Sequence, residues 1–157
     1  MEFDPNKTGT KSSGLFALPF TEEESDLILL PVPWEVTTSY GHGCSLGPDG
    51  IFAASKQLDV CDSLYGDFYQ RGIFQRPTNM EWLNRSKLLK EKALDLRDKI
   101  ENETDFDHED LKAQKEINEA SIELNQWVYE ESKKLLEQKK YPAVIGGDHS
   151  APFGLIK

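Results

Sequence analysis

Two short, continuous apolar runs stand out along this chain, at residues 27–33 and 141–145. An uninterrupted apolar run bounded by turn-forming residues is typical of a strand that is buried on both faces of a parallel sheet. Pro31 and Pro33 predict that the first run leaves the hydrogen-bonded ladder near its end, because proline has no amide hydrogen to donate. We therefore predict two buried parallel strands.

Shorter elements are predicted between these runs. Gln57–Cys61 has the character of another strand, and Ile73–Phe74 that of a brief extended piece before Pro77. Pro48 suits the first turn of a helix, where a missing amide hydrogen leaves no bond unmade. It predicts a short helix over Asp49–Ser55.

Residues 80–140 differ from the rest, with apolar residues at helical spacing among many charged ones. A polar break at Asn102–Asp107 divides this region into two helices, and Asp107 suits the N-cap of the second. Trp82 and Trp127 lie on the apolar stripes, so we interpret them as core or subunit-contact residues. The charged faces are typical of solvated helix surfaces.

The order of these elements predicts an α/β fold. A chain that alternates strands and helices forms a parallel sheet with right-handed crossovers. We expect residues 1–26 to be a lead-in, and residues 27–157 to form an α/β domain with its helical segment at about 80–140. A crossover to a further parallel strand takes about a dozen residues, and only eight follow His149. We therefore expect this chain to be the N-terminal part of a longer protein.

Composition narrows the class of protein. The chain has 157 residues, 38% of them hydrophobic and 29% charged, which suits one globular domain. Its net charge of −10 argues against nucleic acid and anionic membrane as partners, and is compatible with a cationic substrate. No apolar run approaches the roughly 18 residues of a membrane-spanning helix. Cys44 and Cys61 are interpreted as reduced thiols of a cytoplasmic protein.

The second apolar run ends in Gly146-Gly147-Asp148-His149-Ser150. The carboxyl end of a parallel strand is where α/β sheets bind ligands, and two glycines allow a tight turn there. His149 is therefore a histidine at the functional end of a strand, beside a carboxylate that could orient it. The alternative is a histidine that is hydrogen-bonded at the strand end without a metal. Ser150 could open the following helix.

The loop Trp34–Pro48 is long and rich in glycine and hydroxyl residues, and such loops in compact domains are usually functional or disordered. Tyr40 and His42 are its candidates for substrate contact. Tyr40 could equally pack beneath a pocket, and His42 could lie at the surface. His108, in an acidic turn, is interpreted as a surface residue at the start of a helix.

The Gly-Gly-Asp-His-Ser motif after a hydrophobic strand resembles a signature of the ureohydrolase family, which comprises arginase, agmatinase and their relatives. Pro31–Pro33, followed by Thr38–Tyr40 and then by Leu46–Pro48, is similar to the family's first-strand loop. Asp59–Asp67 sits where the family has an acidic second strand. The region Met80–Lys140 matches only as helix.

This resemblance implies a three-layer parallel sheet of the arginase type, of which this chain is the N-terminal part. It also implies a pair of Mn²⁺ ions, one of them bound by His149, with Asp148 in a supporting hydrogen-bonding role. Two metals roughly 3.5–4 Å apart can bridge a hydroxide. That hydroxide would attack a guanidinium carbon, releasing urea and an amine. An agmatinase-like guanidino substrate and a homo-oligomer are implied. A formimidoylglutamase-type hydrolase and a non-catalytic subunit or regulatory relative are the alternatives.

Two departures from the family pattern accompany the resemblance. The family's remaining metal ligands come from an Asp-x-His-x-Asp and an Asp-x-Asp segment, and neither occurs after His149. The nearest upstream candidates, Asp105–His108 and Asp59–Asp62, lie outside the matching region, so this chain alone is expected to be inactive. His42 stands where many agmatinase-like sequences have a basic or other polar residue, which leaves the substrate open.

Overall fold

The computed structural model describes residues 9–10, 13–39 and 41–157. Their sheet has three strands in the order β2-β1-β3: β1 (Leu27–Pro31), β2 (Ile73–Gln75) and β3 (Tyr141–Ile145). Both pairings are parallel, and Leu27 lies opposite Ile73 on one side and Tyr141 on the other. The parallel sheet and both long strands are therefore confirmed.

The helices also follow the predicted order. Pro48 lies in the first turn of α1 (Gly47–Ser55), and the side chain of Asn79 caps α2 (Met80–Glu101) by accepting from the amides of Glu81 and Trp82. Asp107 caps α3 (His108–Glu137) in a capping box with Asp110, as its position after the polar break predicts. The α-helices are α1 (Gly47–Ser55), α2 (Met80–Glu101), α3 (His108–Glu137) and α4 (Phe153–Ile156), and the 3₁₀ turns are η1 (Leu15–Ala17), η2 (Cys44–Leu46) and η3 (Phe68–Arg71).

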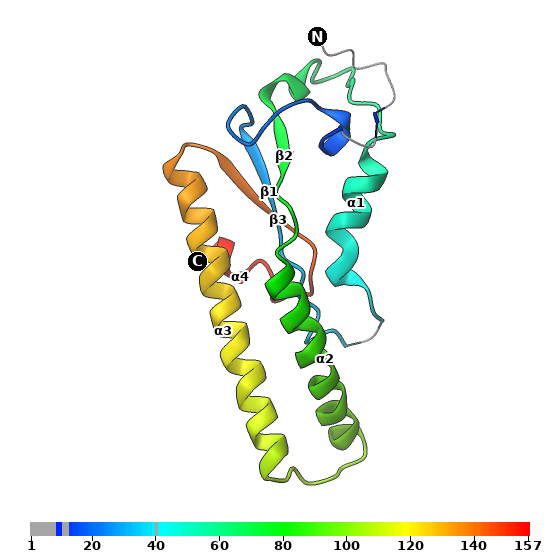
Figure 1. Cartoon of the computed structure of the whole chain (residues 1–157), viewed down its shortest axis with the longest axis vertical. Helices are drawn as coiled ribbons and strands as arrows, with labels where there is room; N and C mark the ends of the chain where they lie inside the picture. Colours follow the sequence, from blue (N-terminus) through cyan, green and yellow to red (C-terminus); the bar gives the residue numbers. More distant parts are fainter. Residues whose placement is uncertain (1–8, 11–12, 40) are drawn as a thin grey trace.

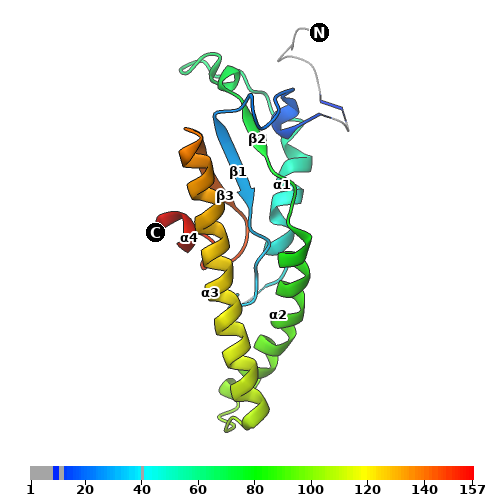
Figure 2. The ribbon, with the colours of Figure 1, turned by 60° about the vertical axis from the view of Figure 1, so that its left-hand side comes forward.

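The described chain forms layers (Figures 1 and 2). The sheet lies between α3 on one side and α1 on the other, and α2 and α3 form a hairpin that extends past the carboxyl ends of the strands. No helix among the described residues combines the length and the apolar character that crossing a membrane requires.

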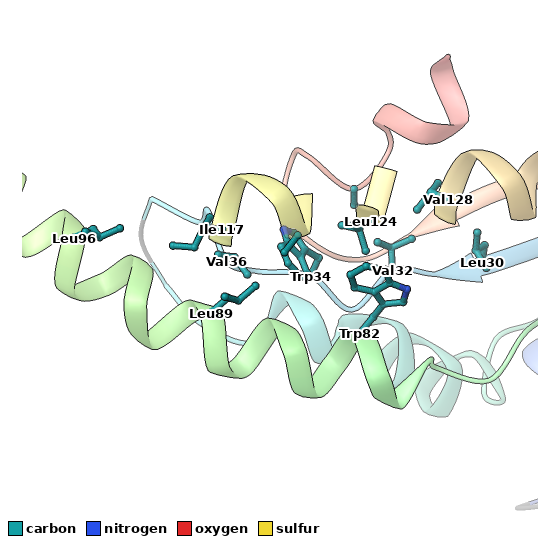
Figure 3. Close-up of a cluster of buried hydrophobic side chains, with 12 residues drawn as sticks. Leu30, Val32, Trp34, Val36, Trp82, Leu89, Leu96, Ile117, Leu124 and Val128 are labelled. Carbon is teal, nitrogen blue, oxygen red and sulfur yellow. The ribbon is translucent and has the colours of Figure 1, made fainter. Parts of the chain in front are cut away.

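The main core lies where the chain leaves β1 and runs between α2 and α3 (Figure 3). Trp34 is fully buried there, and its ring meets that of Trp82 edge-on at a centroid distance of 5.9 Å. The ring of Trp127 lies 5.9 Å from that of Trp82. Trp82 is a core residue, and Trp127 is partly buried against this core, so both lie within the core-or-contact interpretation. This packing ties the hairpin to the segment that follows β1.

Two predictions of local structure are wrong. Gln57–Cys61 is not a strand, nor is the acidic stretch Asp59–Asp67; the second strand is Ile73–Gln75. The Asp59 side chain accepts from the Cys61 amide, and the Asp62 side chain accepts from two amides of its own turn. Aspartates that bond their own backbone in this way favour turns over a sheet ladder.

A third correction concerns the residue that opens the last helix. Ser150 does not cap α4, which begins at Phe153 with Pro152 at its N-cap position. The Ser150 hydroxyl donates to the carboxylate of Asp148 instead, at 2.6 Å. A side chain engaged in its own tight turn is not available to a helix that starts three residues later.

Candidate functional site

The segments that leave β1 and β3 are joined directly by their backbones. The Val32 amide donates to the carbonyl of Ile145 at 3.0 Å, which extends the pairing one residue beyond β1. The Asp148 amide then donates to the carbonyl of Trp34 at 2.7 Å. Because both strands are parallel, their carboxyl ends meet at one edge of the sheet, and these bonds bring the segment of His149 beside the loop that follows β1.

The two glycines of the motif are required by both conformation and space. Gly146 and Gly147 have φ angles of +85° and +80°, in the left-handed region that side chains disfavour. A β-carbon on Gly146 would lie 2.4 Å from Cγ of Pro48, and one on Gly147 would lie 2.7 Å from the carbonyl oxygen of Val32. The sharp turn before His149 therefore depends on glycine at both positions.

Asp148 connects the two segments through its carboxylate. One oxygen, Oδ2, accepts from the amide and the hydroxyl of Thr37 at 3.0 and 2.8 Å. The other, Oδ1, accepts from the amide and the hydroxyl of Ser150 at 3.0 and 2.6 Å. Both oxygens thus serve to hold the turn and the loop in place, and neither orients the imidazole of His149.

His149 itself is exposed at this edge of the sheet. Among the described residues, no group of three or more His, Cys, Asp and Glu side chains is arranged to hold a metal ion. His149 is therefore a single candidate ligand in this part of the chain, and its role as a metal ligand stays a prediction.

Three other residues were singled out from the sequence: Tyr40, His42 and His108. Tyr40 lies outside the described residues. His42 is exposed on the loop, in keeping with the surface alternative, and its contact with a substrate stays a prediction. The side chain of His108 is 90% exposed at the start of α3, where the sequence predicts a surface residue.

Glu35 is a site residue that the sequence reasoning missed. Its Oε2 atom accepts from the amides of Gly43 and Ser45, at 3.0 and 2.9 Å, and from the thiol of Cys44 at 3.7 Å. Burial acts to raise the pKa of Glu35, but these hydrogen bonds favour the charged form and bring the pKa below its ordinary value. The carboxylate is consequently ionised at neutral pH and holds both ends of the loop together.

Helix α2 supports the same loop with three polar side chains. The hydroxyl of Ser86, which is fully buried, accepts from the amide of Glu35 at 3.0 Å. Lys90, only 7% exposed, donates to the hydroxyl of Thr38. Arg97 donates to the carbonyl of Ser39 at 2.7 Å. The sequence pattern predicts only that α2 is an amphipathic helix. The spacing of polar residues does not distinguish Ser86, Lys90 and Arg97 from polar residues that face the solvent.

The arrangement suits a ligand-binding edge. The loop and the turn are held by backbone hydrogen bonds, by the carboxylates of Glu35 and Asp148, and by side chains of α2. The imidazole of His149 is open to solvent. Rigid elements that present one exposed donor are what a preorganised binding site requires.

Comparison with known proteins gives two matches. The profile of the arginase family matches residues 25–157. Over 43 residues the chain is 40% identical to an N(1)-aminopropylagmatine ureohydrolase from Synechocystis sp.. That alignment covers 27% of this chain and 14% of the relative, so the match spans about one seventh of the relative's length. No solved structure matches.

Proposed function

We propose, from the premise that this chain belongs to the arginase family, that the protein serves as a metal-dependent amidinohydrolase. In this proposal it hydrolyses a guanidino compound to urea and an amine. The observation that carries the proposal is the exposed imidazole of His149, at the carboxyl end of β3 and directly after a turn that only glycines can make. Ligands of parallel α/β sheets bind at that end of the strands.

The donor chemistry of His149 fits a divalent transition metal, since a neutral imidazole is a common ligand for such ions. The described residues supply this one donor and no cluster of His, Cys, Asp and Glu around it. By the family resemblance, an Asp-x-His-x-Asp and an Asp-x-Asp segment would supply the other ligands. When bound, a pair of Mn²⁺ ions would provide a hydroxide near neutral pH.

The residues of this chain would prepare the site rather than carry out a chemical step. The Asp148 carboxylate holds the turn beside His149 through Ser150, and joins it to the loop through Thr37. Neighbouring groups of this kind keep a ligand's position constant and commonly affect metal affinity. The backbone that carries His149 would then already be in place when a metal binds.

A small cationic guanidino compound is the proposed substrate class. The relative is named as a ureohydrolase of N(1)-aminopropylagmatine. The net charge of −10 of this chain favours cations over anions near its surface. Agmatine, 4-guanidinobutyrate and N(1)-aminopropylagmatine are the compounds to compare, with formimidoylglutamate as the test of the second hydrolase class. We further propose a cytoplasmic homo-oligomer.

The test is urea release and metal content of the protein at its native length, for the wild type and two histidine variants. His149→Ala should lower both the bound Mn²⁺ and the rate of urea release, the latter by at least about 100-fold, because a ligand is lost. His108→Ala is the matched control, since His108 is likewise an exposed histidine and lies at the start of α3.

Two results would contradict the proposal. Unchanged metal content in the His149 variant would remove this imidazole from the site. A wild type that binds Mn²⁺ yet releases neither urea from the guanidino compounds nor formamide from formimidoylglutamate would favour the non-catalytic partner reading.

A further inference from the structure

Glu35 occupies a junction between three elements. Its own amide is held by Ser86 of α2, and its carboxylate holds the turn Gly43–Ser45, which leads through η2 into α1. That turn reaches the His149 segment directly, because the carbonyl of Cys44 accepts from the amide of Gly147 at 3.3 Å. A continuous series of contacts therefore runs from α2 through Glu35 to the residues just before His149.

The contacts of Glu35 converge on one atom. Oε2 accepts hydrogen bonds from the amides of Gly43 and Ser45 and from the thiol of Cys44. Separately, the backbone carbonyl of Glu35 accepts from the hydroxyl of Thr38 at 3.1 Å. Ser45 is buried, and a buried amide left without an acceptor is costly, so the turn requires an oxygen at this position. The turn is therefore well defined only while an acceptor oxygen stands at this position.

The neighbouring residue reinforces the same geometry. The carbonyl of Trp34 accepts from the Asp148 amide, and Trp34 is fixed by complete burial against Trp82. The His149 segment is thus held by two backbone bonds, one to the residue before Glu35 and one to the turn that the Glu35 carboxylate holds. Release of the turn would leave only the first of these two bonds in place.

We propose that Glu35 is a positioning residue for His149, acting through the Cys44–Gly147 backbone contact. This inference rests on one part of the proposed function, namely that His149 is a metal ligand. In this proposal Glu35 acts through its hold on the Gly43–Ser45 turn and not as a metal ligand. It limits the positions that the Gly146–His149 turn can adopt, and so raises the affinity of the site for Mn²⁺.

The test compares Glu35→Ala and Glu35→Gln with the wild type, with Glu91→Ala as the control. Glu91 is an exposed glutamate on α2, so its removal matches the change in charge. Glu35→Ala should raise the Mn²⁺ concentration for half-saturation by about 10-fold or more, the usual effect of removing a group that supports a metal ligand. Glu35→Gln keeps an acceptor oxygen at the Oε2 position and should stay within about threefold of the wild type.

A merely structural role would lower the melting temperature without this pattern of rescue. An unchanged Mn²⁺ affinity in Glu35→Ala would overturn the proposal. So would a Glu35→Gln variant as impaired as Glu35→Ala, because the charge and not the acceptor oxygen would then be responsible.

Amide hydrogen exchange keeps this test separate from the proposed function. In Glu35→Ala the amides of Gly43, Ser45 and Gly147 should exchange faster than in the control, whether or not the wild type binds Mn²⁺ or releases urea. If the wild type is inactive but exchange accelerates as expected, the proposed function fails while the positioning by Glu35 stands. Unchanged exchange at Gly147 would refute the positioning even in an active enzyme.

Discussion

Replacement of Asp148 by alanine should destabilise the protein by removing the carboxylate that joins the two loops. Four hydrogen bonds are lost, two from Thr37 and two from Ser150, at 2.6 to 3.0 Å. The site is partly exposed, so water can replace some of these contacts. Taking the low end of the usual net range, about 0.5–0.75 kcal/mol per bond, the expected loss for four bonds is roughly 2–3 kcal/mol.

For a domain of this size such a loss lowers the melting temperature by about 4–12 °C. Tryptophan fluorescence is a suitable assay, because Trp34 is buried beside the affected loop and packs against Trp82. Asp105→Ala is the control: it also removes an aspartate charge, but from an exposed position in the link between α2 and α3.

Asp148→Asn separates charge from shape. An asparagine amide can accept from one of the two backbone amides but turns a donor toward the other, which leaves an amide without a partner at a cost of about 1–3 kcal/mol. We therefore expect Asn to be no more than partly effective. If Asp148→Ala were as stable as the Asp105→Ala control, the carboxylate would not be holding the loop, and the assignment of its role would be refuted.

Two further predictions concern groups outside the loop. Iodoacetamide at pH 8 should modify the exposed Cys61 at least about tenfold faster than the half-buried Cys44. Burial, together with the nearby carboxylate of Glu35, raises the pKa of the Cys44 thiol, and the thiolate is the reactive form. Equal modification rates, measured by mass spectrometry, would contradict this. Burial acts to raise the pKa of Glu131, but hydrogen bonds, including one from Arg76 at 2.7 Å, lower it below its ordinary value of 4.5. The stabilisation that the Glu131 carboxylate gives through these contacts is therefore present above pH 4.5, and it is lost as the pH falls through the lowered pKa of Glu131. Arg76→Met should lower the melting temperature at pH 7, and the difference from the wild type should shrink in acid; a difference that is constant with pH would argue against the ion pair.

Much of the fold is predictable because its signals are local. The apolar runs that become β1 and β3, the N-cap at Asp107 and the proline in the first turn of α1 each depend on residues a few positions apart. The prediction of a strand at Gln57–Cys61 is wrong because a second kind of local signal acts there. Asp59 and Asp62 bond to amides two or three residues away, and this local chemistry overrides an apolar pattern that resembles a strand.

The candidate site divides in the same way. The Gly-Gly-Asp-His-Ser sequence by itself indicates a tight turn and a candidate ligand, because two consecutive glycines after a strand permit few other geometries. No local sequence pattern identifies Glu35 as a site residue, because its partners become neighbours only when the loop closes. The same is true of Lys90, which is buried because α2 packs over that loop. Composition and spacing carry no information about either contact.

The sequence by itself determined β1, β3, the three longer helices α1, α2 and α3, the parallel arrangement and the position of His149 at a strand's carboxyl end. The tertiary structure decided that β1 lies between β2 and β3, and that Asp148 reaches Thr37 across 111 positions of sequence. The physical reason is the range of the interactions. Periodicity and capping act within a turn or two of chain, whereas hydrogen bonds between distant segments exist only after packing brings those segments together.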